Sequence, residues 1–479
     1  MDVKVIREAG FADSSIEQWR AVAEKALRGA SFDETLVSRT DDAIAYGPLY
    51  ERREDARILA RSDSASPWRI VQRVDDPDTD RAAVQAADDV ASGATGLCLV
   101  FEGAPTAYGY GIKSDPEKLT QILDKVPLDG LHIRIDANPH SRTTAEWMLA
   151  ALVKRGADPR TLQINFGIDP AAIFGGTGRL RMSIDALKAS MPQSLSGFFA
   201  FGIPGLLLEA DSRPYHNAGA SIAQELGAMM ATATSHLRMF QEARQPLVHA
   251  APLIGFALSV DQDQLQSIAK IRALRLLWTR VQEACGAPAT AAQIHAETSM
   301  RMMTRLDAET NILRATIAAF AAGVGGADTV CVLPHTLTHG LPDAFARRIA
   351  RNTQLVLMDE AHLDHVADPA AGSGGIEALT DAFCEAGWDE FKRIEAEGGI
   401  FESLIKGAYQ ARVRKAHEAR IALYRDGGRH LVGTTLYPAK EERAVTTLDA
   451  ERIAMPDEGS ARCERMPLRR IDEEVGPSA

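Results

Sequence analysis

The sequence has 479 residues, 46% of them hydrophobic and 25% charged, which excludes disorder of the whole chain and predicts two or three domains or one large α/β barrel with added arms. Its 53 basic and 65 acidic residues give a net charge of −12, which argues against a nucleic acid or an anionic membrane as partner. The sequence has no long apolar run and no signal-peptide pattern, and its five cysteines include no Cys-x-x-Cys pair. We therefore expect a cytoplasmic protein without disulfides or a cysteine zinc site.

Residues 1–60 are predicted to form an N-terminal arm without a hydrophobic core of its own. A serine cap followed by an apolar face that includes Trp19 indicates one short helix, and the segment from Tyr46 to Tyr50 is predicted to be extended. Exposed apolar side chains are unfavourable in water unless something covers them. We therefore expect Trp19, Tyr46, Leu49 and Tyr50 to form an interface with a partner, the alternative being that the arm packs on its own barrel as a lid.

Residues 61–400 alternate short β-rich runs with amphipathic helical stretches. Strands are predicted at 68–74, 96–101, 131–136, 162–167, 205–210, 254–260, 292–298 and 328–334. Helices are predicted at 79–92, 115–125, 142–155, 178–189, 217–243, 262–284, 309–322 and 342–358. Strands that are each followed by a helix predict a (β/α)₈ TIM barrel, because parallel strands need crossover helices. A doubly wound sheet is the alternative, but the turn after the first strand lacks that fold's glycines.

Residues 401–479 are predicted to form a helical extension and a charged tail. The helical pattern continues to about Arg425 and breaks at Asp426-Gly-Gly. From Lys440 onward, 17 of 40 residues are charged and large apolar residues are sparse. Such a segment is expected to be loosely ordered or draped over a partner.

Several chemistry-bearing residues fall where a barrel places its active site, but none forms a complete catalytic set. Asp136 and Glu209 end predicted strands, where either could be catalytic, although a hydrogen-bonded rim carboxylate is the commoner explanation. His295 lies within a strand and is more simply a core histidine. His335 and His339 have the spacing of metal ligands but follow a proline in a predicted loop, so a metal site is not favoured.

Two further motifs are weak. The glycines of Gly175-Gly-Thr-Gly178 could hold a phosphate if they preceded a helix, but the Lys-Ser/Thr of a nucleotide loop is missing. Glu360 to His365 contains ligand-type residues that are more simply a polar connector.

Several segments together resemble the adenosylcobalamin-dependent acyl-CoA mutases, specifically the methylmalonyl-CoA mutase family. In sequence order they are Asn217-Ala-Gly-Ala220, Ile268-Ala-Lys-Ile-Arg-Ala-Leu-Arg-Leu-Leu-Trp278, Leu341-Pro342, Ala346-Arg-Arg-Ile-Ala-Arg-Asn-Thr-Gln-Leu-Val-Leu357, Asp368-Pro-Ala-Ala-Gly-Ser373 and Glu395-Ala-Glu-Gly-Gly399. The resemblance implies a substrate barrel with the coenzyme A arm threaded along its axis. It also implies a separate domain that carries the cobalamin.

The departures from that family concern its functional residues. The family's Tyr-His pair, which contacts the acyl group, falls on Arg213 and Pro214, and the family's His-x-Gln-Thr-Ser-Gly becomes His295-Ala-Glu-Thr-Ser-Met300. Glu297 thus replaces an amide and Met300 a glycine, while His295 alone survives as a possible functional side chain. The cobalt-ligating Asp-x-His-x-x-Gly string does not occur in the sequence.

The resemblance therefore implies a small (beta) subunit without catalytic residues, without a bound cofactor or metal, and without a cobalamin-binding domain. Its partner would be a large catalytic methylmalonyl-CoA mutase subunit that carries adenosylcobalamin, in a heterodimer. The alternative is a catalytic substrate barrel that uses a separately encoded cobalamin-binding subunit, and a third possibility is a chaperone that binds a mutase transiently. We also expect the barrel interior to be closed to coenzyme A, because both faces of the predicted strand 96–101 are apolar.

Overall fold

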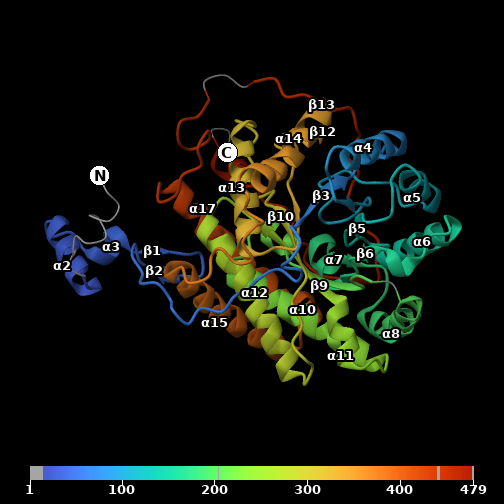
Figure 1. Ribbon diagram of the computed structural model, residues 1–479, viewed down its shortest axis with the longest axis horizontal. Coiled ribbons are helices and arrows are strands. Elements are labelled where there is room, and N and C mark those ends of the chain that lie inside the picture. The colour runs from blue at the N-terminus through green and yellow to red at the C-terminus, as the bar shows by residue number, and fades with distance from the viewer. Residues whose placement is uncertain (1–13, 203, 440–442, 477–479) are drawn as a thin grey trace, which may run out of the picture.

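The computed structural model describes residues 14–202, 204–439 and 443–476, so parts of the expected arm (1–13) and of the expected tail (440–442, 477–479) lie outside the described residues. Its central feature is a parallel eight-stranded sheet that curves into a TIM barrel, as predicted (Figure 1). The strands are β3 (Arg69–Val74), β4 (Gly96–Leu99), β5 (His132–Ile135), β6 (Gln163–Asn165), β8 (Leu208–Asp211), β9 (Ile254–Val260), β10 (Ile294–Thr298) and β11 (Thr329–Cys331). They are joined in the order β6-β5-β4-β3-β11-β10-β9-β8.

Backbone contacts between β6 and β8 complete the barrel. The N–H of Phe166 donates to the carbonyl of Leu206 at 2.8 Å, and Ile168 forms a parallel bridge with Leu208. The two end strands of the sheet are therefore paired with each other, which removes the exposed edges of an open sheet.

Helices cover the outside of the barrel. They are α4 (Thr79–Ala91), α5 (Pro116–Leu123), α6 (Ser141–Lys154), α7 (Pro170–Thr177), α8 (Ile184–Phe201), α9 (Arg213–Asn217), α10 (Ile222–Glu242), α11 (Leu247–Ala250), α12 (Gln264–Ala284), α13 (Thr310–Gly325) and α14 (Ala344–Leu355), which continues as a π-helical turn (Val356–Glu360). Short 3₁₀ turns cover Pro159–Thr161 and Ala251–Leu253. Among the described residues, no helix combines the length and hydropathy needed to cross a bilayer.

The predicted helix at 178–189 is misplaced. The carboxylate of Asp169 accepts the N–H groups of Ala171 and Ala172, and Pro170 occupies the first turn, so α7 begins directly after β6. Residues 179–180 form a short strand, β7 (Arg179–Leu180), and α8 follows. Asp169 followed by Pro170 is the local sequence signal that marks this helix start.

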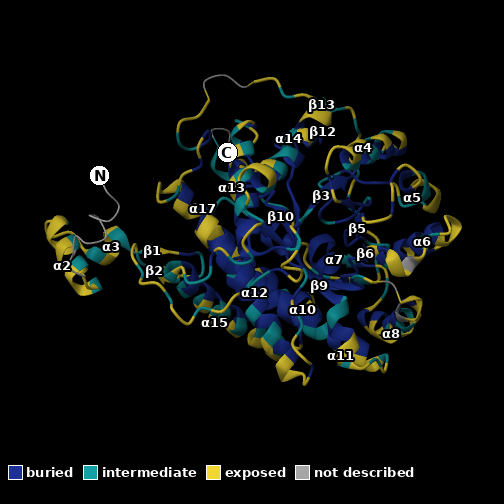
Figure 2. Cartoon of the chain, in the orientation of Figure 1, coloured by how far each residue is buried: buried dark blue, intermediate teal, exposed yellow. Residues whose placement is uncertain are grey.

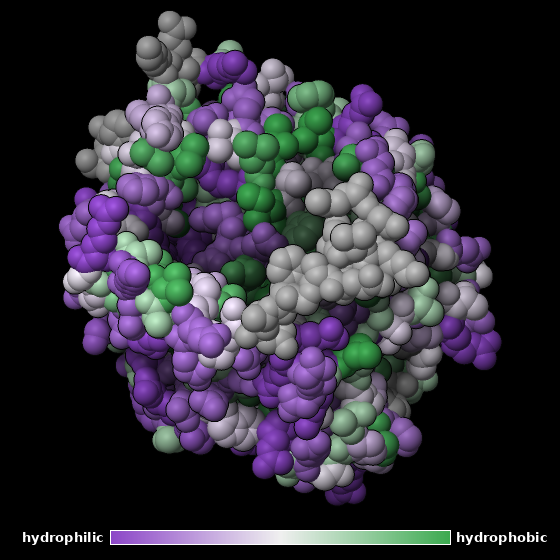
Figure 3. Space-filling view, turned by 60° about the vertical axis from the view of Figure 1, so that its left-hand side comes forward, coloured by the Kyte–Doolittle hydropathy of each residue, from purple (hydrophilic) through white to green (hydrophobic). Residues whose placement is uncertain are grey.

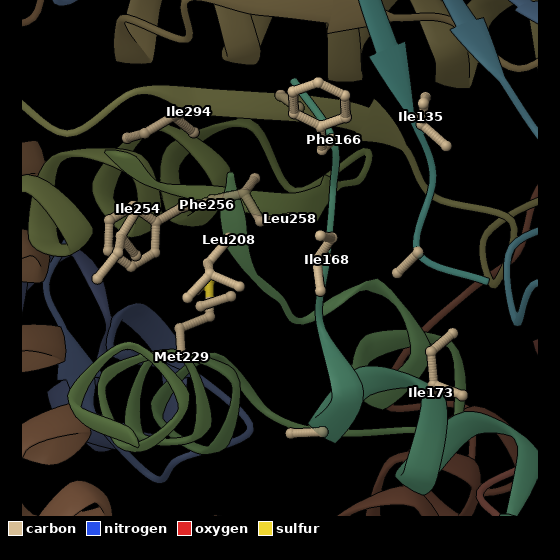
Figure 4. Close-up of a cluster of buried hydrophobic side chains, with 14 of the residues drawn as sticks. Ile135, Phe166, Ile168, Ile173, Leu208, Met229, Ile254, Phe256, Leu258 and Ile294 are labelled. Atoms are coloured by element: carbon tan, nitrogen blue, oxygen red, sulfur yellow. The ribbon is translucent and has the colours of Figure 1, made fainter. Parts of the chain in front are cut away.

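The outward faces of the strands carry the hydrophobic core. In Figure 4, Phe256 and Leu258 of β9, Ile294 of β10 and Leu208 of β8 lie in one cluster with Met229 of α10. The alternation along each strand thus sends apolar residues toward the helices. The intervening residues point into the barrel.

The N-terminal arm has two parts, the first of which stands apart from the barrel in Figures 1 and 2. It consists of α2 (Ile16–Ala26), which confirms the predicted short helix, and α3 (Phe32–Leu36), and neither helix has a buried residue. The Trp19 ring meets the Phe32 ring edge-on at 6.0 Å between centroids. Trp19 therefore packs within this helical pair and not on the barrel.

The second part, residues 38–60, lies against its own barrel. It begins with a hairpin of β1 (Ser38–Arg39) and β2 (Ala45–Tyr46). The N–H of Leu59 donates to Asp368 at 2.7 Å, and the N–H of Ala223 donates to Asp42 at 3.1 Å. For this part, the packing is the one that the lid alternative expected.

The C-terminal segment covers the barrel mouth of this same chain. The helical extension comprises α15 (Gly374–Ala396), α16 (Ile400–Ile405) and α17 (Ala408–Arg425), and the segment after it contains β13 (Thr447–Leu448), β14 (Ala461–Arg462) and α18 (Ile471–Val475). β13 pairs with β12 (Leu341–Pro342), and β14 pairs with β7. The expectation of a loose or partner-bound tail is thus wrong for residues 443–476, because backbone pairing holds them to loops at the carboxyl ends of the strands.

Candidate functional site

The interior of the barrel is charged, not apolar. Arg73 of β3 lies opposite Cys98 of β4, which lies opposite Arg134 of β5, so these side chains share one inward-facing layer. Both arginines are almost completely buried. The expectation of an apolar interior is therefore wrong, because it rested on a single strand, whose inward residues Cys98 and Val100 are uncharged.

Arg134 is held by two carboxylates. Its two terminal nitrogens each donate to one oxygen of Glu209 at 2.7 Å, and its Nε donates to Asp136 at 3.0 Å. Burial alone would raise the pKa of Asp136, but Arg213 and Arg134 beside it hold that pKa well below its usual range. Asp136 and Glu209 are therefore structural ion-pair partners of a buried arginine, which agrees with the simpler of the two interpretations made from the sequence.

Arg213, the first residue of the short helix α9 that follows β8, occupies the centre of this network and is 0% exposed. Its terminal nitrogens lie 2.8 Å from Asp136 and 2.7 Å from Asp211, and 3.3 Å from Glu297. Glu297 also pairs with Arg73 at 2.9 Å. The position that the family resemblance assigns to acyl-group contact is thus filled by a cation whose hydrogen bonds are already used.

The three residues singled out in the string His295-Ala-Glu-Thr-Ser-Met300 occupy three separate environments. The Nδ1 of His295 lies 2.7 Å from the Thr329 hydroxyl in the layer nearest the amino ends of the strands, far from the mouth. Glu297 is fully buried and accepts the hydroxyl of Tyr108 at 3.1 Å. Met300 is buried in the hydrophobic core. The structure therefore does not bring these positions together.

The neighbouring Tyr-His pair also points away from the interior. Pro214 lies in the first turn of the short helix α9, in which Tyr215 packs edge-on against Tyr409 at 5.2 Å between ring centroids. His216 lies 2.8 Å from Glu225 and 2.7 Å from Ser299, and burial together with nearby Arg301 lowers its pKa to about 4. His216 is therefore neutral at pH 7 and has both ring nitrogens occupied.

The weaker candidates are also placed. Gly175 and Gly176 lie inside α7, and Gly178 is its left-handed C-cap with φ of 75°, so this motif follows a helix and cannot use a helix N-terminus for phosphate. His335 and His339 lie in a turn after β11, as predicted. Within the described ranges, no three His, Cys, Asp or Glu side chains are arranged to hold a metal ion.

The expected interface residues separate into two groups. Leu49 is 45% exposed, and Trp19 lies on the protruding helical pair. Tyr46 instead packs partly against the barrel core, and the ring of Tyr50 lies against the backbone at the start of α15. Only the first group remains available to a partner without rearrangement.

Sequence reasoning missed the arginines of the interior. Arg134 lies between Ile133 and Ile135 along its strand, and this period of two was the available signal, whereas Arg73 follows Gln72 and shows no such alternation. What could not be read was that Arg213, from a different part of the chain, meets the carboxylates that surround them.

We predict that coenzyme A does not thread along this barrel, because paired arginine and carboxylate side chains fill the inward-facing layers. Crystals of the chain soaked in coenzyme A should show no density along the axis. Density for a pantetheine arm between Arg134 and Arg213 would contradict the prediction.

Comparison with known proteins gives one consistent result. A family model described as methylmalonyl-CoA mutase matches residues 60–476. A methylmalonyl-CoA mutase small subunit of Streptomyces virginiae is 35% identical over 459 residues, which cover 91% of this chain and 72% of that protein. A relative from Mycobacterium tuberculosis, named probable methylmalonyl-CoA mutase small subunit, is 42% identical over 300 residues, 60% of this chain and 47% of that protein. The methylmalonyl-CoA mutase of Escherichia coli is 25% identical over 510 residues, 96% of this chain and 70% of that protein. The chain thus spans about half of the mycobacterial relative.

Proposed function

Because the chain belongs to the methylmalonyl-CoA mutase family, we propose that it is a small subunit without catalytic chemistry, which pairs with and stabilises a large subunit that carries adenosylcobalamin. The assembled enzyme would interconvert (R)-methylmalonyl-CoA and succinyl-CoA. The cofactor supplies the radical chemistry of such a rearrangement, and the protein supplies binding and shielding.

The observation that carries this proposal is that Arg213 is fully buried and ion-paired. A side chain that contacts an acyl group must have free hydrogen-bonding capacity in an open site, whereas Arg213 is completely buried and paired with Asp136, Asp211 and Glu297. Opening this position to a substrate would leave several carboxylates buried and unpaired, which is strongly unfavourable.

The described residues at the barrel mouth do not fit a cobalamin. His216 is bonded through both ring nitrogens, and His295 lies toward the opposite end of the barrel. The segment 443–476 crosses the mouth, where the N–H of Arg469 donates to the carbonyl of Asn217 at 2.8 Å. We therefore derive no catalytic step through that cofactor in this chain.

The test is reconstitution with a large subunit of the family. The chain alone should form no succinyl-CoA from (R)-methylmalonyl-CoA in the presence of adenosylcobalamin. Adding it to the large subunit should raise the melting temperature of that subunit, because a partner that binds only the folded state stabilises it by mass action. A catalytic barrel would instead give activity with an isolated cobalamin-binding subunit, and a transient chaperone would not remain bound during size exclusion.

We predict that the chain alone does not bind adenosylcobalamin. Titration of the cofactor with the protein should leave its visible absorption bands unchanged, because no Asp-x-His-x-x-Gly string is available to replace the lower ligand. A shift of those bands at micromolar protein would contradict the proposal.

A further inference from the structure

A cavity of about 710 Å³ lies beside the barrel, at the carboxyl ends of β5 and β6 and between α6, α7 and α8. Its volume is in the range of pockets that bind small organic molecules. It is separate from the charged interior, since none of Arg73, Arg134 or Arg213 lines it. Neither the reaction of the family nor the subunit pairing proposed above gives it a role.

The cavity wall carries two arginines without carboxylate partners. Arg142 donates to the hydroxyl of Ser190 at 3.0 Å and to that of Ser194, both on α8. Arg181 lies with Nη1 2.8 Å from Nδ1 of His140. In the part of the chain that the structure describes, no Asp or Glu oxygen lies within ion-pair distance of either guanidinium, in contrast to every arginine of the barrel interior.

The acids that line the cavity do not balance this charge. The oxygens of Asp169 accept the N–H groups of Ala171, Ala172 and Asp211, and burial raises its pKa to about 8. Glu146 is exposed to water, where a charge is screened.

The start of α6 adds to the positive character of the cavity. The helix begins at Ser141, and the side chain of its N-cap, His140, makes no capping hydrogen bond. The backbone N–H groups of the first turn therefore receive no side-chain acceptor there, and the positive end of the helix dipole faces the same wall as Arg142.

The rest of the lining is apolar and includes one aromatic ring. It includes Trp147 of α6, Met182, which precedes α8, and Leu187 and Met191 of α8. The Trp147 side chain is only partly buried. An aromatic and thioether wall binds an apolar body, while two unpaired guanidinium groups bind an oxyanion.

We infer that this cavity binds a small amphipathic anion, with its carboxylate or phosphate group on Arg142 and Arg181 and its apolar part against Trp147. Either head group presents the planar or tetrahedral oxygens that guanidinium groups bind. The inference does not depend on the proposed function, because neither the substrate nor the partner subunit of that function was assigned to these residues.

The test uses calorimetric titration of the full chain with octanoate and with octyl phosphate, and 1-octanol as the probe that lacks a charge. At least one of the two anions should bind, and 1-octanol should not. The Arg142→Gln and Arg181→Gln variants should each bind that anion at least about tenfold more weakly, the loss expected for one charge-assisted contact. Arg160→Gln is the matched control, since Arg160 is 76% exposed and pairs with Asp158 away from the cavity.

Which anion binds more tightly distinguishes a carboxylate ligand from a phosphate ligand. Binding should also quench tryptophan fluorescence in the unchanged chain and not in Trp147→Phe. The inference is overturned if neither anion binds at about millimolar concentration, or if either arginine variant that folds binds as the unchanged chain does. Because Arg181 is exposed, its variant keeps the test decisive even if Arg142→Gln does not fold.

Discussion

Replacing Arg213 with methionine is expected to lower the free energy of unfolding by about 3–5 kcal/mol, the cost of removing one partner from a buried ion pair. Arg213 is the cation shared by Asp136, Asp211 and Glu297, all of which are buried. Methionine is unbranched like the arginine stem but is shorter and carries no charge, so these carboxylates would have to be protonated or hydrated in the folded state. Urea unfolding followed by circular dichroism measures the change.

Two further variants make the result specific. Arg160→Met, at an exposed ion pair, should change the free energy of unfolding by less than about 1 kcal/mol. Adding Glu297→Gln to Arg213→Met should recover part of the loss, because it removes one of the uncompensated negative charges. If Arg213→Met unfolds at the same urea concentration as Arg160→Met, the network is not needed to keep the barrel folded.

Removing residues 1–37 is expected to weaken pairing with the large subunit by about a hundredfold or more, while the barrel stays folded. The two helices of this segment have no buried residue and stand apart from the barrel (Figure 2). An apolar anchor such as Trp19 at the centre of an interface commonly accounts for 2 kcal/mol or more, and this deletion removes the whole pair of helices. Figure 3 turns this side forward and shows the molecular surface hollowed near its centre, with hydrophilic and hydrophobic residues around the hollow.

The boundary at residue 37 follows from the structure. A deletion of residues 1–60 would also remove the contacts of Asp42 with Ala223 and of Leu59 with Asp368, so loss of pairing could then reflect damage to the barrel. Size exclusion with the large subunit and thermal melting of the truncated chain separate the two effects. Val153→Ala, an exposed apolar position on α6 on the other side of the molecule in Figure 1, should leave pairing unchanged. Unchanged affinity of the truncated chain would show that the helical pair is not the interface.

The architecture was predictable because it depends on local patterns. All eight barrel strands were predicted, since each is a short hydrophobic run and most are followed by an amphipathic helical stretch. The misplacement of the helix predicted at 178–189 also has a local cause, because Asp169 and Pro170 start the preceding helix α7 directly after β6. The two-part nature of the arm and the path of the tail were not predictable, since both depend on which distant backbone groups are free to pair.

What the sequence determined by itself is the barrel, the helices around it and the family to which the chain belongs, because periodicity and motif spacing lie along the chain. Only the tertiary structure decided what the functional positions do. The sequence places Arg213 at a lost acyl-contact position, but its role follows from Asp136 and Glu297, which are distant in sequence and lie within 3.3 Å of it. Arg142 and Arg181 likewise cannot be recognised as unpaired from the sequence, because the absence of a carboxylate partner is a property of the folded surroundings. The sequence shows which residues carry a charge, whereas the neutralisation of that charge by a partner depends on burial and on neighbours that the fold brings together.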